Sequence, residues 1–157
     1  MSASIHILKE TRRLLLMAIK NLSEEQFFMI PEGFDNNIAW NLGHIISVQQ
    51  RLTYGRSQRE MDMPAELSAM FLPGTSPDDW TIQPNTTDLM AMVEAHIAHI
   101  ERDYAIAGFF DGFREMKTST GVLLRNIDES MVFNNFHEGL HLGTILSLRN
   151  FVVPAKT

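Results

Sequence analysis

Apolar residues recur every three or four positions in four long segments of the sequence, a spacing that places them on one face of an α-helix. We expect these helices to cover residues 4–22, 36–55, 86–107 and 128–149. Together with the long connection between the second and third helices, this pattern predicts an all-α fold and suggests a four-helix bundle. A different all-α packing of the same helices would satisfy the periodicity equally well. The length of 157 residues fits a single domain, residues 1–157.

Short polar residues indicate where these helices begin, because their side chains can accept hydrogen bonds from the first free backbone N–H groups. The expected starts are Asn36 or Asn37 for the second helix, Thr86 or Thr87 for the third, and Asp128 or Ser130 for the fourth. Ser23 followed by Gln26 is the pattern of a capping box, which predicts a single helical turn. In the first helix, Arg12 occupies a position of the apolar stripe.

The connection between residues 55 and 85 contains four prolines and is longer than most connections in compact domains. Connections of this kind often act as functional lids. Within it, Pro64–Phe71 can form a short helix with proline at its first position. The later segment Lys117–Ile127 is rich in β-branched and apolar residues, and it is either a strand or an extended stretch.

Composition excludes several classes of function. The chain has 13 basic and 19 acidic residues, a formal net charge of −6, which argues against a nucleic-acid partner. Its longest uninterrupted apolar run, Leu14–Ile19, is far too short to span a membrane. Charged residues interrupt the N-terminal segment, so it does not resemble a signal peptide, and we expect a cytoplasmic protein. The absence of cysteine leaves only nitrogen and oxygen atoms as metal ligands and rules out a cysteine nucleophile.

Among the six histidines, the pair His137 and His141 carries the strongest signal. Residues four apart lie one above the other on a helix, so two imidazoles at this spacing can bind one metal ion. The same face continues through Ile145 and Leu148, which indicates that the pair is buried. Buried imidazoles need either a metal or hydrogen-bond partners. We favour a metal over two core histidines bonded to backbone or water.

The segment His137–His141 also matches the His-Glu-x-x-His motif of zinc proteases, but the rest of the chain does not fit such an enzyme. Position 147 is Ser147 where a third histidine would be needed, and no glutamate follows Glu138. A third metal ligand must therefore come from earlier in the chain. His44 is the best candidate, although its surroundings suit a semi-buried histidine equally well.

The other histidines are weaker candidates. His96 falls near the apolar stripe of the third helix, so it can reach the rim of the site, although an edge-of-core position is the simpler interpretation. His99 falls closer to solvent, and His6 lies near the terminus and should be exposed.

Glu138 lies about 100° around the helix from His137. It is therefore either exposed, or a hydrogen-bond acceptor behind a metal ligand, or a general base at the cleft. Gly139 and Gly143 form a step of small residues that suggests the close approach of another helix.

Two motifs resemble the DinB superfamily. The segment Asn37–Ile46, "NIAWNLGHII", is similar to its Trp-x-x-x-His helix, and Phe133–Arg149, "FNNFHEGLHLGTILSLR", is similar to its final helix. The segment "TSTGVLLRNIDESMVF" resembles the usual lead-in to that helix. The resemblance implies an up-down-down-up four-helix bundle with a long crossover between helices two and three. It also implies a divalent metal, often zinc or nickel, held by His44, His137 and His141, and in many members a homodimer.

Some members of this superfamily transfer low-molecular-weight thiols or are thiol-dependent isomerases, and others are described as metal-dependent hydrolases. Our first hypothesis is therefore a metal-dependent enzyme that transfers a low-molecular-weight thiol to an electrophilic small molecule. A hydrolase of the same fold is the first alternative. The second is a bundle without enzymatic activity that binds a metal or a small ligand in a stress response.

Overall fold

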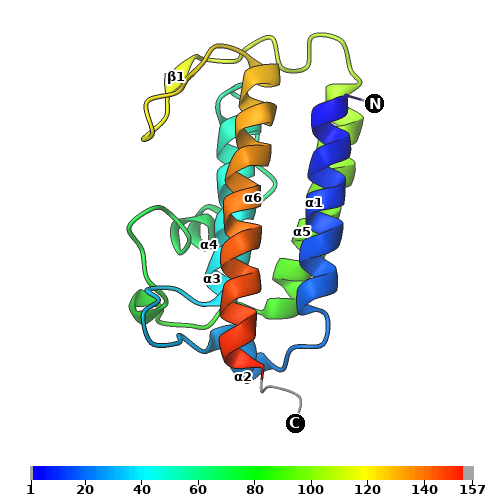
Figure 1. The fold of residues 1–157 in the computed structure, drawn as a ribbon. Helices are drawn as coiled ribbons and strands as arrows, with labels where there is room; N and C mark the ends of the chain where they lie inside the picture. Colours follow the sequence, from blue (N-terminus) through cyan, green and yellow to red (C-terminus); the bar gives the residue numbers. More distant parts are fainter. Residues whose placement is uncertain (1, 154–157) are drawn as a thin grey trace.

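Four long helices lie side by side in the computed structural model, which describes residues 2–153 (Figure 1). They are α1 (Ala3–Ile19), α3 (Ile38–Gln50), α5 (Thr86–Tyr104) and α6 (Ile127–Val152). Helices α5 and α6 each contact both α1 and α3, so the four surround a common core. The prediction of a mainly helical fold is confirmed.

Shorter elements connect these helices. They are α2 (Glu24–Phe28), the π-helix η1 (Arg51–Gly55), α4 (Ala65–Ala69), the 3₁₀-helix η2 (Pro77–Asp79), β1 (Met116–Lys117) and β2 (Leu123–Leu124). The two strands pair antiparallel, with Met116 opposite Leu124, and form a small hairpin before α6. The segment Lys117–Ile127 therefore contains a strand rather than only an extended stretch.

Helix caps confirm some of the expected boundaries and correct others. Asn37 caps α3 by accepting a hydrogen bond from the backbone of Trp40, and Ser23 forms the expected capping box with Gln26. The cap of α5 is Asn85, not Thr86 or Thr87, because the Asn85 side chain reaches the N–H groups of residues 87 and 88.

The remaining boundaries differ by small amounts. Asn126 caps α6, which therefore begins at Ile127 instead of near Asp128 or Ser130. The first helix ends at Ile19, three residues before the expected end. Pro64 occupies the N-cap position of α4, without a side-chain hydrogen bond, and is therefore not its first helical residue.

Helix α3 is buried on almost all sides, although the sequence predicts a single buried face. Every residue of α3 except Val48 is buried. The reason is the crossover after η1, which covers the side of α3 that faces away from α5 and α6: Phe71 is fully buried there and its ring lies directly over Gly43. This burial places His44 in the interior.

Within residues 2–153, no helix combines the length and the apolar character that a membrane crossing requires.

Candidate metal centre

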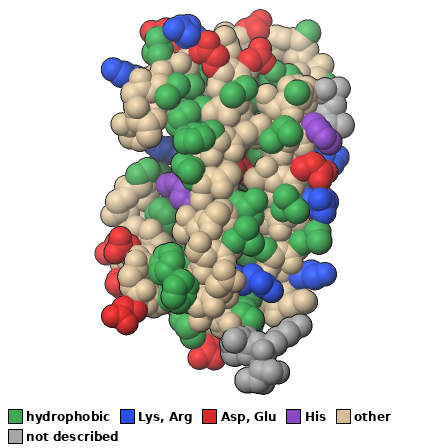
Figure 2. All heavy atoms as spheres, in the orientation of Figure 1, with side chains coloured by type: hydrophobic (Ala, Val, Ile, Leu, Met, Phe, Trp, Pro, Cys, Tyr) green, Lys and Arg blue, Asp and Glu red, His purple; other side chains and the backbone are tan. Residues whose placement is uncertain are grey.

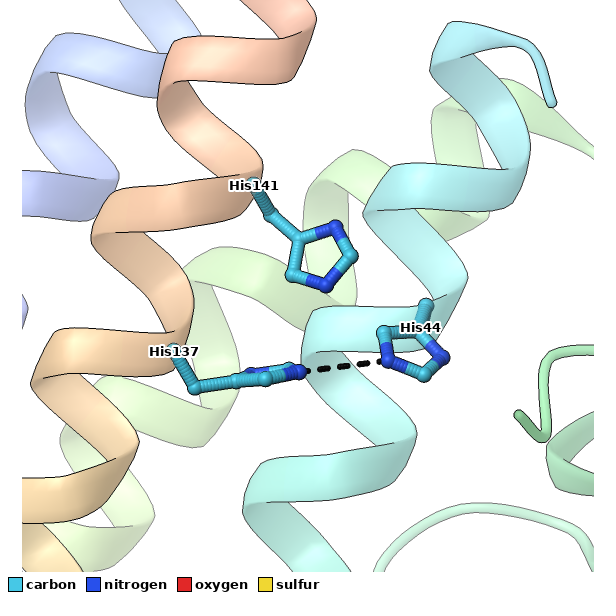
Figure 3. A group of neighbouring side chains, drawn as sticks. All are labelled: His44, His137 and His141. Carbon is cyan, nitrogen blue, oxygen red and sulfur yellow. Dashed lines mark hydrogen bonds between the residues drawn. The ribbon is translucent and has the colours of Figure 1, made fainter. Parts of the chain in front are cut away.

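Three histidines from two helices point toward one another (Figure 3). His44 comes from α3, and His137 and His141 come from successive turns of α6. One nitrogen from each ring can be chosen so that all three nitrogens lie within 4.8 Å of one another. The Nε2 atoms of His44 and His137 are 3.2 Å apart. The structure thus brings together all three residues that the sequence singled out as metal ligands.

Hydrogen bonds to the outer nitrogens fix which nitrogen faces the centre. His44 Nδ1 donates to the backbone carbonyl of Phe71 at 2.6 Å, since a carbonyl can only accept. His141 Nδ1 lies 2.8 Å from Oδ1 of Asn41. Nδ2 of Asn41 donates to the carbonyl of Asn37, so Oδ1 is the atom left to accept from His141. In both neutral rings the proton is therefore on Nδ1, and Nε2 presents a lone pair.

This arrangement fits a tetrahedral metal ion. With metal–nitrogen distances of about 2.0 to 2.1 Å, two ligands of a tetrahedral ion lie about 3.3 Å apart. The 3.2 Å between Nε2 of His44 and Nε2 of His137 is close to that edge length. His137 Nδ1 is buried and has no hydrogen-bond partner among the described residues. Acceptors behind two of three imidazoles are typical of metal-binding histidines.

Burial keeps these rings neutral. It lowers the pKa of His137 to about 4, with a further contribution from His44. Burial, followed by the charges that His137 and His44 would carry, lowers the pKa of His141 to about 3. Burial also lowers the pKa of His44, although its bond to Phe71 acts in the opposite direction. Near pH 7 the site therefore presents three neutral imidazoles, the protonation state that binds a metal.

A cavity of about 810 Å³ opens beside the histidines, and His44 and His137 form part of its wall. Trp40 lies next to them, with its ring stacked on that of His44 at 4.5 Å between centroids. The rest of the lining includes Arg51 and Arg56 after α3 and residues 118–120 of the hairpin. In Figure 2 this side of the molecule is notched, and basic and histidine side chains are visible in the notch.

Glu138 is neither exposed nor in hydrogen-bond contact with the histidines. It is fully buried and forms two hydrogen bonds with Arg12 of α1, at 2.8 and 3.0 Å, and accepts a third from Asn134 at 2.9 Å. Arg12 is fully buried as well, which explains the charged residue in the apolar stripe of α1. The exposed interpretation of Glu138 is therefore wrong, because α1 packs on this side of α6.

The glycine step on α6 does not mediate helix packing. Gly139 and Gly143 are both exposed, and a Cβ atom added at either would meet nothing within 4 Å. The small residue that does allow a close approach is Gly43 on α3, where an added Cβ would overlap the ring of Phe71.

The remaining histidines lie apart from this centre. His6 is exposed, as expected. His96 is buried and His99 half-buried, and both approach Asp62 of the crossover, with His99 Nδ1 only 2.7 Å from the carboxylate. Asp62, His96 and His99 are spaced closely enough for a metal. However, Nε2 of Gln50 donates to Nδ1 of His96, so the proton of the neutral His96 ring is on Nε2, the nitrogen that faces Asp62. A protonated nitrogen has no lone pair for a metal ion.

Sequence reasoning missed the two acceptors and the basic wall of the cavity. Phe71 lies 27 residues from His44 and contributes only its backbone, so no side-chain pattern marks it. Asn41 could have been found, because it lies on α3 one turn before His44 and within the Trp40–His44 motif. Arg51 could also have been found, because it lies two turns after His44, where η1 continues α3.

The molecule is thus a helical protein with three neutral histidines converging beside a cavity. Residues 7–145 match the model of the DinB superfamily, and the chain belongs to that superfamily, whose members typically bind metal. No curated protein matches the sequence significantly.

Proposed function

We propose that the protein is a divalent-metal-dependent enzyme that transfers a low-molecular-weight thiol to an electrophilic small molecule. The observation that carries this proposal is the convergence of the three histidines at the wall of a cavity of about 810 Å³. Three protein ligands leave a coordination position for a substrate, which is the arrangement of catalytic rather than structural zinc sites. Zinc or nickel would suit three imidazoles.

The residues of the chain have separable parts in this proposal. His44, His137 and His141 would hold the ion, and the bonds to Phe71 and Asn41 orient His44 and His141. A bound divalent metal would supply stabilisation of the deprotonated, nucleophilic form of a thiol. The chain has no cysteine, so the attacking sulfur has to come from a second substrate.

Apolar side chains on the cavity wall that are themselves buried or half-buried would limit the access of water to the reacting atoms. They include Val48, Leu52, Met61 and Phe133. Exclusion of water favours attack by a thiol over attack by water, because a competing hydrolysis needs a positioned water molecule. This supports the transferase over a hydrolase of the same fold.

We assign Glu138 a positioning part rather than that of a general base. Its carboxylate oxygens bond to Arg12 and Asn134, and Glu138 does not line the cavity. Glu138 follows His137 directly, so its attachment to α1 fixes the rotation of α6 about its axis and with it the direction of His137 and His141.

We further infer the up-down-down-up bundle and the homodimer that the superfamily implies. The contacts among α1, α3, α5 and α6 support the bundle. Exposed apolar side chains on α1 and α6 support a contact with a second copy; they include Ile7, Leu14, Met17, Val132 and Phe136. Sedimentation analysis measures the oligomeric state directly.

Elemental analysis of protein purified without added metal tests the metal site, and a panel of small thiols with an electrophile tests the reaction. We expect about one equivalent of a divalent metal in the wild type, which is lost in His44→Ala and His137→Ala. His6→Ala, an exposed histidine outside the site, is the matched control and should retain the metal.

Three results would contradict the proposal in different ways. If the wild type holds less than about a tenth of an equivalent of metal, and His137→Ala does not change this amount, the proposed metal site is wrong. If the electrophile is still converted when no thiol is present, the protein is a hydrolase and not a transferase. A stoichiometric metal with no conversion of any substrate would favour a binding protein.

A further inference from the structure

The charge on the cavity wall is opposite to that of the chain. The chain carries a net charge of −6, yet the cavity is lined by Arg51 and Arg56 and by no aspartate or glutamate. An acidic protein in which the charged side chains around this cavity are all basic creates a local field there that favours an anion.

Arg51 is the guanidinium available to a ligand. Arg56 already donates to two backbone carbonyls, those of Arg114 at 2.9 Å and Glu115 at 2.6 Å, which anchors the segment before the hairpin. The side chain of Arg51 is exposed and forms no hydrogen bond or ion pair with any residue in the range 2–153. Its planar group carries five N–H donors, which suit the two oxygens of a carboxylate or the oxygens of a phosphate.

The backbone at Arg51 is irregular in a way that bears on its position. Helix α3 changes there into the π-helix η1, and the backbone N–H of Arg56 donates to the carbonyl of Arg51 at 3.0 Å, five residues back. Single π-turns inside helices occur frequently at functional sites, because the inserted residue rotates the side chains that follow. Arg51 lies seven residues after His44, which corresponds to roughly 10 Å along the helix.

The hairpin contributes neutral donors to the same cavity. Thr118, Ser119 and Thr120 line it, with Oγ1 of Thr118 and Oγ1 of Thr120 3.0 Å apart. Hydroxyl groups and a guanidinium on the wall of one cavity can both donate to a bound oxyanion.

We propose that Arg51 binds the carboxylate of a small-molecule substrate whose reacting end lies at His44, His137 and His141. The assignment of this anion to a substrate rests on the proposed function, whereas its binding at Arg51 does not. The separation of the two positions along the helix favours a substrate with its charged group and its reacting atom at opposite ends. Either the thiol or the electrophile can carry the carboxylate, and the experiment separates the two.

Binding is measured first on metal-free protein, so that the result does not depend on catalysis. Trp40 lines the cavity, and its fluorescence reports the titration of hexanoate and of its uncharged counterpart hexanamide. We expect hexanoate to bind about tenfold more tightly than hexanamide to the wild type. In Arg51→Gln this preference should fall below about twofold, and Arg51→Lys should retain part of it.

Arg13→Gln is the matched control, since it removes the same charge from an exposed arginine of α1 that is paired with Glu10. It should leave the preference for hexanoate unchanged. Equal binding of hexanoate and hexanamide by the wild type, or an undiminished preference in Arg51→Gln, would overturn the assignment. Circular dichroism of each variant verifies that it is folded, and an exposed position such as Arg51 should tolerate both changes.

Kinetics then identify the substrate that carries the charge. With 6-mercaptohexanoate and its amide as the thiols, and an acid and amide of matched length as the electrophiles, Arg51→Gln should raise KM about tenfold only for the charged member of one pair, with kcat within about twofold. An equal effect on acids and amides of both pairs would overturn the assignment to a substrate. If the wild type shows no conversion at all but the preference for hexanoate at Arg51 holds, the proposed function fails and the anion site stands.

Discussion

At the scale of single residues, hydrogen-bond acceptors determine the protonation of the metal-binding candidates. The carbonyl of Phe71 and the amide oxygen of Asn41 hold protons on the outer nitrogens of His44 and His141, so the inner nitrogens are ready to bind before any ion arrives. The spacing of the histidines identifies the ligands, but the orientation and protonation of His44 and His141 depend on two groups that are not themselves ligands.

Breaking the buried ion pair of Arg12 and Glu138 should strongly lower stability. Glu138→Ala would leave a fully buried guanidinium without its carboxylate partner, so we expect the free energy of unfolding to fall by about 3 to 5 kcal/mol. The double variant Arg12→Met/Glu138→Leu should lose less than Glu138→Ala alone, because it removes both charges together.

Chemical denaturation measures these free energies, and a kinetic assay separates the two interpretations of Glu138. If Glu138 were a general base, Glu138→Gln would abolish turnover even in protein that is folded and fully loaded with metal. If it positions α6 through Arg12, stability should fall first, with activity following the occupancy of the metal site.

At the scale of helices, the contact between α3 and the crossover depends on one glycine. A methyl group at Gly43 would overlap the ring of Phe71, which is fully buried. Gly43→Ala should therefore push the crossover away from α3, lowering stability by about 1 to 3 kcal/mol and weakening metal binding through the displaced carbonyl of Phe71.

Gly139→Ala on α6 is the matched control, because an added methyl group there meets nothing. We expect it to raise helix stability by up to about 1 kcal/mol and to leave metal affinity unchanged. Isothermal titration with zinc measures the affinity of both variants. Equal metal affinities in Gly43→Ala and Gly139→Ala would show that the position of Phe71 does not govern the site.

Local sequence patterns predicted the helices well and their surroundings less well. Periodicity located α1, α3, α5 and α6 and the pair His137 and His141, because these features depend on residues close together in the chain. His44 followed from the lack of a third ligand after His141. The burial of Glu138 could not be predicted in this way, since its partner Arg12 lies 126 residues away. Likewise, the sequence alone does not distinguish Gly43 from Gly139. Only the structure shows that a side chain at Gly43 would overlap Phe71, whereas one at Gly139 would meet nothing.

At the scale of the whole molecule, buried neutral histidines make the metal-free protein sensitive to acid. Burial, helped by the charge of Arg12, lowers the pKa of His96 to about 4, against the opposing effect of Asp62. In the unfolded chain a histidine has a pKa of about 6.5. Between these values the unfolded state binds the additional proton, so stability falls as the pH drops from about 6.5 toward 4.

The slope of the unfolding free energy against pH is proportional to the number of protons taken up on unfolding. Replacing His96 with leucine should reduce this number by about one in the window between about pH 4 and 6.5. The exposed His6→Leu variant is the control and should leave the slope unchanged. Denaturant titrations of metal-free protein at a series of pH values measure both. The same slope in His96→Leu and wild type would contradict a neutral, buried His96.

The bond between His44 and the Phe71 carbonyl also governs how quickly an ion can leave. Release of the ion breaks its bond to His44, whose ring is held by the crossover on one side and stacked on Trp40 on the other. We therefore expect ion exchange to be coupled to opening of the crossover. Loading with zinc should slow proteolysis within residues 55–85, and the dissociation rate of the ion should match the rate at which that segment becomes cleavable.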